Sequence, residues 1–190
     1  MFSLVYPPTP STITGRRMSN RDELLPIVEP SGLVTGIAPR SLCHGGGMLL
    51  HPVVNLHIID RQERILLQKR SASKHMWPHC WDTAVGGHIG YGEQPDEALV
   101  READEELGLH DFNPVFLGTH VYENQREREL VALYAAIVPE LPEHYCSEVE
   151  ELRWWTYDEI AKASKARKAD FTPAFLEEFG RISGQLLALL

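Results

Sequence analysis

A glycine-rich segment that leads into a strongly acidic helix constrains this chain more than any other feature. Residues 87–109 read GHIGYGEQPDEALVREADEELGL. Pro95 stands near the first helical position and Gly108 just past the last, an arrangement that favours a helix over residues 94–107. The segment therefore predicts a glycine-rich lead followed by a helix with defined ends.

The predicted helix carries a stripe of carboxylates. Between Glu93 and Glu106 there are seven acids and a single base, Arg101. Glu102, Glu105 and Glu106 are spaced i, i+3 and i+4, so their carboxylates share one face. The apolar residues of the helix point to another face: Val100, Ala103 and Leu107. Like charges at this spacing destabilise a helix by a few tenths of a kcal/mol per pair. A hard divalent cation such as Mg²⁺ would compensate, because it binds carboxylates together with waters and substrate phosphates. For such a stripe taken alone, the alternative is a solvated face with Arg101 as its partner.

Outside this segment the sequence predicts short strands and two further helices. Two hairpins are predicted. The first joins strands over 24–28 and 33–37, and the second joins strands over 52–60 and 65–69. Later strands are predicted over 115–122, 129–138 and 151–156, and helices over 157–168 and from the Thr172-Pro173 cap toward residue 190. Since strands and helices are mixed without regular βαβ alternation, an α+β domain is favoured.

The two ends of the chain differ in character. Residues 1–20 contain Pro7, Pro8 and Pro10 among Ser and Thr, a composition that predicts a flexible N-terminal extension before one domain over 21–190. The last helix instead has one apolar face, made of Phe175, Phe179, Ile182 and Leu186. We expect this face to dock onto the core, with a homodimer interface as the alternative.

Charge and composition limit the partners. The 18 Lys and Arg against 27 Asp and Glu give a formal net charge of −9. The sequence has no long basic run that could offset the repulsion between this negative charge and a phosphate backbone. Binding to bulk nucleic acid is therefore not expected. No stretch approaches the roughly 20 apolar residues that cross a bilayer, and no basic n-region precedes an apolar h-region. We therefore expect a cytoplasmic protein without membrane contact. Its three cysteines, which lack a CxxC pair, are expected to be reduced thiols: Cys43, Cys80 and Cys146.

The acidic segment as a whole resembles the Nudix box, G-x5-E-x7-R-E-U-x-E-E-x-G-U, of the Nudix hydrolase superfamily. The fixed positions of that pattern match at Gly87, Glu93, Arg101, Glu102, Glu105, Glu106 and Gly108, and the aliphatic positions are Ala103 and Leu109. The resemblance implies the Nudix fold, a mixed β-sheet sandwiched between α-helices, in which the box is a loop-helix-loop that holds a divalent metal against a diphosphate. It implies that three glutamates bind Mg²⁺ or Mn²⁺: Glu102, Glu105 and Glu106. It further implies that Arg101 and Glu93 support the loop and helix, and that the backbone at Gly87 approaches metal or phosphate.

A second resemblance covers roughly residues 40–136 and is to the isopentenyl-diphosphate isomerase branch of the superfamily. In that branch two histidines seven residues apart, a third after the strand that enters the box, and two glutamates at i and i+2 surround one divalent metal. The matching positions here are His44, His51, His88, Glu127 and Glu129. Spacing i to i+2 places both glutamates on one face of a strand. Three imidazoles suit Mn²⁺, Zn²⁺ or Fe²⁺ better than Mg²⁺, so a second, transition-metal site is implied. A structural or surface role is the alternative for each histidine taken singly.

The same branch binds the substrate diphosphate through basic residues, and Arg40, Arg70 and Lys74 fall on those positions. Solvated surface bases are the alternative. The resemblance fails at one position, because isomerases of this type use a cysteine directly before the Gly-His pair as one of two proton-transfer groups. Gly86 stands there in this chain, and glycine has no side chain that could transfer a proton. Neither Cys80 nor Cys43 occupies the corresponding position.

The complete box and the missing cysteine together favour a hydrolase over an isomerase. We expect a Nudix enzyme that uses Mg²⁺ or Mn²⁺ and water to cleave a phosphoanhydride in a small X-diphosphate. One of the three box glutamates, or Glu127, is expected to serve as general base. Two alternatives stay open: an isopentenyl-diphosphate isomerase that retains Glu129 as proton carrier, and a catalytically silent diphosphate-binding module. No feature of the sequence specifies the X group.

Overall fold

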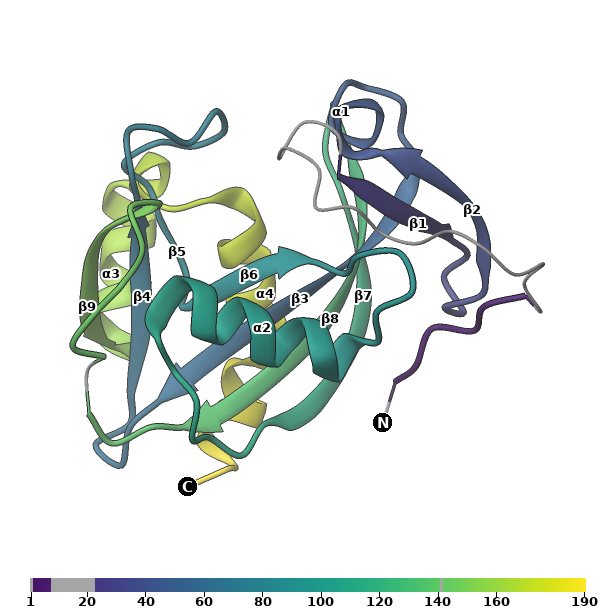
Figure 1. Ribbon diagram of the computed structural model, residues 1–190. Coiled ribbons are helices and arrows are strands. Elements are labelled where there is room, and N and C mark those ends of the chain that lie inside the picture. The colour runs from purple at the N-terminus through teal and green to yellow at the C-terminus, as the bar shows by residue number, and fades with distance from the viewer. Residues whose placement is uncertain (1, 8–22, 141) are drawn as a thin grey trace. The chain divides into compact units, whose positions relative to one another are not determined.

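The computed structural model describes residues 2–7, 23–140 and 142–190 (Figure 1). Within these ranges the elements are, in chain order, β1 (Leu24–Val28), β2 (Val34–Pro39), α1 (Arg40–Cys43), β3 (Leu50–Ile59), β4 (Arg64–Arg70), β5 (Trp81–Thr83), β6 (Val85–His88), α2 (Pro95–Leu107), β7 (Val115–Glu123), β8 (Arg128–Ile137), β9 (Val149–Thr156), α3 (Tyr157–Ala166), the 3₁₀ turn η1 (Lys168–Asp170) and α4 (Pro173–Leu187). The predicted α+β class is confirmed.

Strands form two sheets. β1 and β2 make an antiparallel pair, and a larger sheet has the order β5-β4-β3-β8-β7, with β6 paired to β3 and β9 paired to β4. Both predicted hairpins are confirmed, because β1 pairs with β2 and β3 pairs with β4. None of the helices in the described ranges is long and apolar enough to cross a membrane.

By their contacts, the described residues fall into two compact units. The first unit combines the described residues of segments 1–54, 87–99 and 118–132, and the second combines those of segments 55–86, 100–117 and 133–190. The chain passes repeatedly from one to the other, so β3 and α2 each begin in the first unit and end in the second. The division into an extension over 1–20 and a domain over 21–190 stays a prediction.

The first unit contains part of the segment predicted to be a flexible extension. Leu4 is buried and Val5 forms a bridge with Leu33. The Tyr6 hydroxyl accepts a hydrogen bond from the Gly92 amide at 2.9 Å and donates to the Glu93 carbonyl at 3.1 Å. Residues 2–7 therefore differ from the expectation, because their side chains find partners in the loop before α2. The remainder of the predicted extension, residues 8–20, lies outside the described residues.

The second unit is built around β4, which pairs with both β9 and β5. Thr172 caps α4 by accepting a hydrogen bond from the Phe175 amide at 3.2 Å, with Pro173 in the first turn, as predicted. Phe175, Ile182 and Leu186 of α4 are buried. The Phe175 ring stacks on Phe171, and Phe171 and Trp81 each meet Trp155 edge to face. The expected core docking of the last helix is confirmed.

Candidate active site and metal centre

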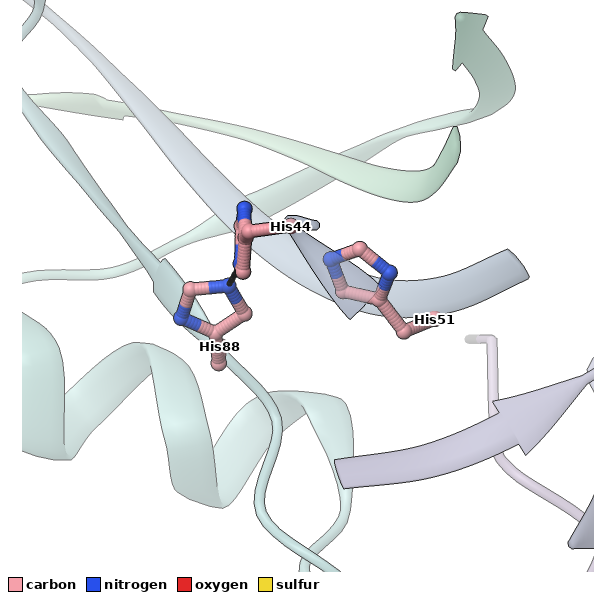
Figure 2. A group of neighbouring side chains, drawn as sticks. All are labelled: His44, His51 and His88. Atoms are coloured by element: carbon pink, nitrogen blue, oxygen red, sulfur yellow. Dashed lines mark hydrogen bonds between the residues drawn. The ribbon is translucent and has the colours of Figure 1, made fainter. Parts of the chain in front are cut away.

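Three histidines meet in the first unit (Figure 2). His44 follows α1, His51 lies in β3 and His88 ends β6. One ring nitrogen of each lies within 4.8 Å of the other two, a spacing that one metal ion could bridge. The structure thus brings together the three histidines that the second resemblance pairs with a metal, and their role as ligands stays a prediction.

His51 has the tautomer that a metal ligand needs. The side chain is buried, and its Nδ1 lies 3.0 Å from the Leu49 carbonyl oxygen. Because a carbonyl can only accept, Nδ1 carries the proton and Nε2 presents its lone pair. Nε2 is buried and has no hydrogen-bond partner among the described residues. Burial lowers the pKa of His51 to about 4, so the ring is neutral at physiological pH. A buried, neutral imidazole with its other nitrogen anchored to the backbone fits a metal site.

Glu127 orients a second histidine. The His44 Nδ1 donates to Glu127 Oε2, and Glu127 Oε1 accepts from the Asn124 amide at 2.9 Å. Burial alone would raise the pKa of Glu127, but these hydrogen bonds outweigh it and lower the pKa. The Nε2 of His44 then faces the Nε2 of His88 at 2.8 Å. With both oxygens engaged by protein donors, Glu127 is placed to hold His44, while its predicted roles as ligand and base remain untested.

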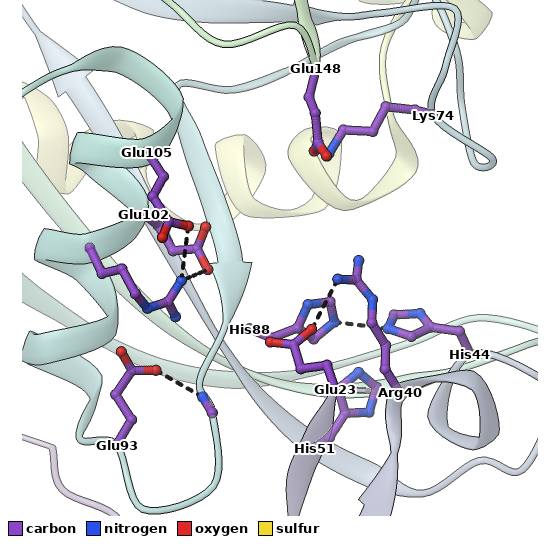
Figure 3. Close-up of polar contacts among 12 residues, drawn as sticks. Glu23, Arg40, His44, His51, Lys74, His88, Glu93, Glu102, Glu105 and Glu148 are labelled. Atoms are coloured by element: carbon purple, nitrogen blue, oxygen red, sulfur yellow. Dashed lines mark hydrogen bonds and ion pairs between the residues drawn. The ribbon is translucent and has the colours of Figure 1, made fainter. Parts of the chain in front are cut away.

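Two other predicted residues lie in the same unit. Glu129 Oε1 is 3.9 Å from His51 Nε2, so all five residues of the predicted transition-metal site are gathered there. Arg40 forms an ion pair with Glu23 at 3.1 Å (Figure 3).

The loop of the box before α2 is held by a hydrogen bond within this unit, in which the Gly90 amide donates to Glu93 Oε2 at 2.8 Å. This contact agrees with the supporting role that the resemblance implies for Glu93.

In the second unit, Arg101 neutralises two of the three box glutamates. Its Nη1 lies 2.6 Å from Glu102 and 3.4 Å from Glu105 (Figure 3). The Glu105 side chain is 50% exposed, whereas that of Glu102 is 14% exposed. The partner expected for a solvated stripe is therefore present for these two carboxylates.

Glu106 differs from its neighbours because it turns into the protein. Only 6% of the residue is exposed, and its Oε2 accepts from Gln68 Nε2 at 3.1 Å and from the Gly86 amide at 3.3 Å. Burial raises the pKa of Glu106 to about 8. A nearby divalent cation would favour the charged carboxylate, so this buried acid fits the metal site that the box implies.

One residue of the predicted apolar face of the helix lies elsewhere than expected. Val100, expected on the apolar side of the helix, is instead 51% exposed.

The predicted phosphate-binding bases of this unit are engaged by the protein. Arg70 donates to the Met76 carbonyl and to Asp82, each at 3.1 Å, and so holds the loop over 71–79. Lys74 pairs with Glu148 (Figure 3). Gly87, in the first unit, lies partly exposed in β6. Contact of these residues with a diphosphate stays a prediction.

Sequence reasoning missed several polar residues of the second unit. Gln68 contacts Glu106, and Glu178 of α4 is 1% exposed yet accepts hydrogen bonds from Asn55 and His57. The available signal was the presence of polar residues within otherwise apolar strands, as in LHPVVNLHII and RILLQKR. Such residues need a buried partner, and the sequence does not name that partner.

Comparisons with known proteins agree on one family. Residues 49–175 match the family model described as the NUDIX domain. An isopentenyl-diphosphate Delta-isomerase of Agromyces mediolanus is 30% identical over 179 residues, which cover 91% of this chain and 87% of that protein. An uncharacterized Nudix hydrolase of Streptomyces coelicolor is 31% identical over 173 residues, covering 87% and 91%.

Solved structures share the fold. A crystal structure from Deinococcus radiodurans has a TM-score of 0.68 at 23% identity, covering 76% of this chain and 90% of that chain. A NUDIX hydrolase from Nitrosomonas europaea has a TM-score of 0.56 at 22% identity, covering 73% and 94%. The fold that the box predicts is therefore confirmed, and the named relatives include both hydrolases and isomerases.

Proposed function

Because this chain belongs to the Nudix family, we propose that it is a metal-dependent hydrolase that cleaves the phosphoanhydride bond of a small X-diphosphate compound. The observation that carries the proposal is the complete set of box glutamates, with Glu106 buried against Gln68 and the Gly86 amide. Glu102, Glu105 and Glu106 would hold Mg²⁺ or Mn²⁺. When bound, such an ion neutralises charge on the phosphates and lowers the pKa of the attacking water.

The chain's own residues would supply the remaining parts of the reaction. Arg101 keeps Glu102 and Glu105 in place through its ion pairs. Lys74 and Arg70 would contribute positive charge to the diphosphate once their present partners release them. The general base would be one of the box glutamates or Glu127. A carboxylate can accept a proton from the attacking water only while it is ionised, and for the buried Glu106 a nearby cation would supply that condition at neutral pH.

A panel of diphosphates tests the proposal. We expect the protein with Mg²⁺ or Mn²⁺ to release inorganic phosphate from at least one nucleoside, sugar or prenyl diphosphate, leaving the corresponding monophosphate. Chelation with EDTA should abolish the release, because no box carboxylate can replace the cation. Binding of these compounds without any product would instead identify a silent diphosphate-binding module.

Isopentenyl-diphosphate isomerisation is the second candidate. Two observations favour it, namely the gathering of His44, His51 and His88 with Glu127 and Glu129, and the isomerase relative from Agromyces mediolanus. Gly86 counts against it, because the position of the second proton-transfer group has no side chain. The hydrolase is therefore preferred.

The histidine cluster leads to a prediction of metal content. Protein purified without chelator should contain Mn²⁺, Zn²⁺ or Fe²⁺ by elemental analysis, because three neutral imidazoles suit such ions. Burial keeps His51 neutral down to about pH 4, whereas ordinary imidazoles protonate near pH 6.5. Because protons compete with a metal ion for imidazole nitrogens, we expect occupancy to fall below about pH 6.

A matched pair of variants controls this measurement. His51→Ala combined with His88→Ala should lose the metal, while His110→Ala combined with His144→Ala should keep it, since the latter two side chains are exposed. Equal metal content in the two double variants, or no transition metal in the parent protein, would remove the second metal site.

A further inference from the structure

Asn55 is the one residue of β3 that is not buried. Its side chain is nevertheless held firmly, because Nδ2 donates to Glu178 Oε1 at 2.6 Å. The other oxygen of Glu178 lies 2.9 Å from His57 Nε2. Both Glu178 and His57 are about 1% exposed, so the Asn55 amide is fixed by a buried pair.

The anchoring determines which way the carboxamide points. A carboxylate accepts hydrogen bonds, so the Nδ2 of Asn55 faces Glu178 and its Oδ1 faces the opposite direction. That direction is toward Gly86, where a Cβ atom would lie 2.8 Å from Oδ1. Among the described hydrogen bonds, the Asn55 side chain engages only Glu178, and it does so through Nδ2. The side chain thus presents an oriented acceptor that the protein itself leaves unused.

This acceptor lies beside the box. The Gly86 amide, next to Asn55 Oδ1, donates to Glu106 Oε2 at 3.3 Å. The carboxamide oxygen therefore occupies the space of a missing side chain, one residue away from a box carboxylate. All five residues of this arrangement belong to the second unit: Asn55, His57, Gly86, Glu106 and Glu178.

We infer that Asn55 Oδ1 accepts a hydrogen bond from the organic group of the substrate, and that the substrate is a diphosphate whose organic group carries a hydroxyl or amino donor. The inference rests on the proposed hydrolase function and names its substrate class. A prenyl group placed here would remove water from Oδ1 without offering a donor. Leaving a buried acceptor unpaired is costly, and a site built to bind a hydroxyl rejects the analogue that lacks it.

Matched alkyl diphosphates test the inference directly. We would compare kcat/KM for butyl diphosphate with that for 2-hydroxybutyl, 3-hydroxybutyl and 4-hydroxybutyl diphosphate. At least one hydroxylated compound should be preferred by about 10-fold or more. Asn55→Leu should abolish that preference by lowering kcat/KM for the hydroxylated compound about 10-fold or more relative to that for butyl diphosphate. Because the readout is a ratio within one protein, a general loss of folded enzyme does not alter it.

Two further variants secure the comparison. Asn113→Leu makes the same substitution at an exposed asparagine of the same unit, and it should keep the preference. Asn55→Ala leaves room for water to reach Glu178, and it replaces Asn55→Leu if the latter does not fold. Equal kcat/KM for all four compounds, or a preference that survives in both Asn55 variants, would overturn the inference. An equal fall in kcat on all four substrates in the Asn55 variants would also overturn the inference, because Oδ1 would then act on the attacking water and not on the organic group.

Binding separates this inference from the hydrolase proposal. The methylenebisphosphonate analogues of the four compounds cannot be hydrolysed at the bridging position, and calorimetry with Mg²⁺ measures their Kd. Preference for a hydroxylated analogue without hydrolysis of any diphosphate would refute the hydrolase and retain the donor-bearing ligand. Hydrolysis of all four diphosphates without preference in rate or Kd would retain the hydrolase and refute the role of Asn55.

Discussion

Glu105→Gln and Glu106→Gln should each reduce turnover of the best diphosphate substrate by about 100-fold or more, as expected when a preorganised electrostatic group is lost. Glutamine keeps the shape of glutamate but cannot supply the negative charge that holds a divalent cation. The effect should appear in kcat measured at saturating Mg²⁺. For Glu106 the side chain is already surrounded by Gln68 and the Gly86 amide, so the neutral amide finds partners and the fold is retained.

Asp104→Asn is the matched control for these variants. Asp104 lies on the same helix, its side chain is 55% exposed, and its Oδ1 lies 3.5 Å from Nε2 of the surface residue His110. Removing this charge should leave kcat within about 2-fold, the scale expected for a surface substitution. If Glu105→Gln and Glu106→Gln turned over substrate as fast as Asp104→Asn, the assignment of the box glutamates would be wrong.

Stability gives an independent measurement on Glu106. Its pKa is raised from 4.5 to about 8, so between these values the folded state binds a proton that the unfolded state has released. The free energy of unfolding of the parent protein should therefore fall as pH rises from 5 to 8 in the presence of EDTA. Glu106→Gln cannot ionise and should lose this dependence, becoming more stable than the parent near pH 8 and similar to it near pH 5. Chemical denaturation at the two pH values tests this, and parallel pH profiles would contradict it.

The wild-type protein should not isomerise isopentenyl diphosphate. Isomerisation requires protonation at one carbon and removal of a proton at another by two groups held out of water. Glu129 is retained in β8, but position 86 offers no side chain. Incubation in deuterated water with Mg²⁺ and Mn²⁺ should give neither dimethylallyl diphosphate nor deuterium incorporation above a control without enzyme. Deuterium uptake faster than diphosphate hydrolysis would reverse the order of the two enzymatic candidates.

Gly86→Cys alone should fail to restore the isomerase reaction. A Cβ at this position meets Asn55 Oδ1 at 2.8 Å, and Asn55 is held in place by Glu178. Relieving that contact should cost about 1–3 kcal/mol of stability, as for other overpacked sites. Thermal denaturation measures this cost, and deuterium exchange measures activity. An unchanged melting temperature together with rapid exchange would show that Asn55 moves aside freely.

The elements that could be predicted from the sequence have their signals within a few residues. The Thr172-Pro173 cap, the Pro95 start and the Gly108 end of the box helix are examples, because capping residues act on the adjacent turn. The gathering of the three histidines was reached through the family resemblance. Their distances from one another in the chain carry no geometric information of their own.

The remaining features depend on contacts between distant segments. Glu105 and Glu106 are successive helix residues about 100° apart, so spacing alone did not show that one is exposed and the other buried. The direction of Glu106 depends on Gln68 and Gly86, and the exposure of Val100 likewise reflects what covers the helix. β5 and β6 were missed because segments of three and four residues are too short to show a periodicity.

The Tyr6 hydroxyl, which bridges the Gly92 amide and the Glu93 carbonyl, links the start of the chain to the dynamics of the box loop. Because the Gly92 amide can exchange its proton with solvent only when this bond opens, its exchange rate reports detachment of residues 2–7. Leu4 and Gln94 form two further hydrogen bonds of 3.0 and 3.2 Å. Val5 forms two backbone bonds, with the Gly32 carbonyl at 3.0 Å and the Val34 amide at 2.9 Å, so detachment removes all of these bonds together. Hydrogen exchange at Gly92 therefore reads out how tightly a segment almost ninety residues away in sequence is attached.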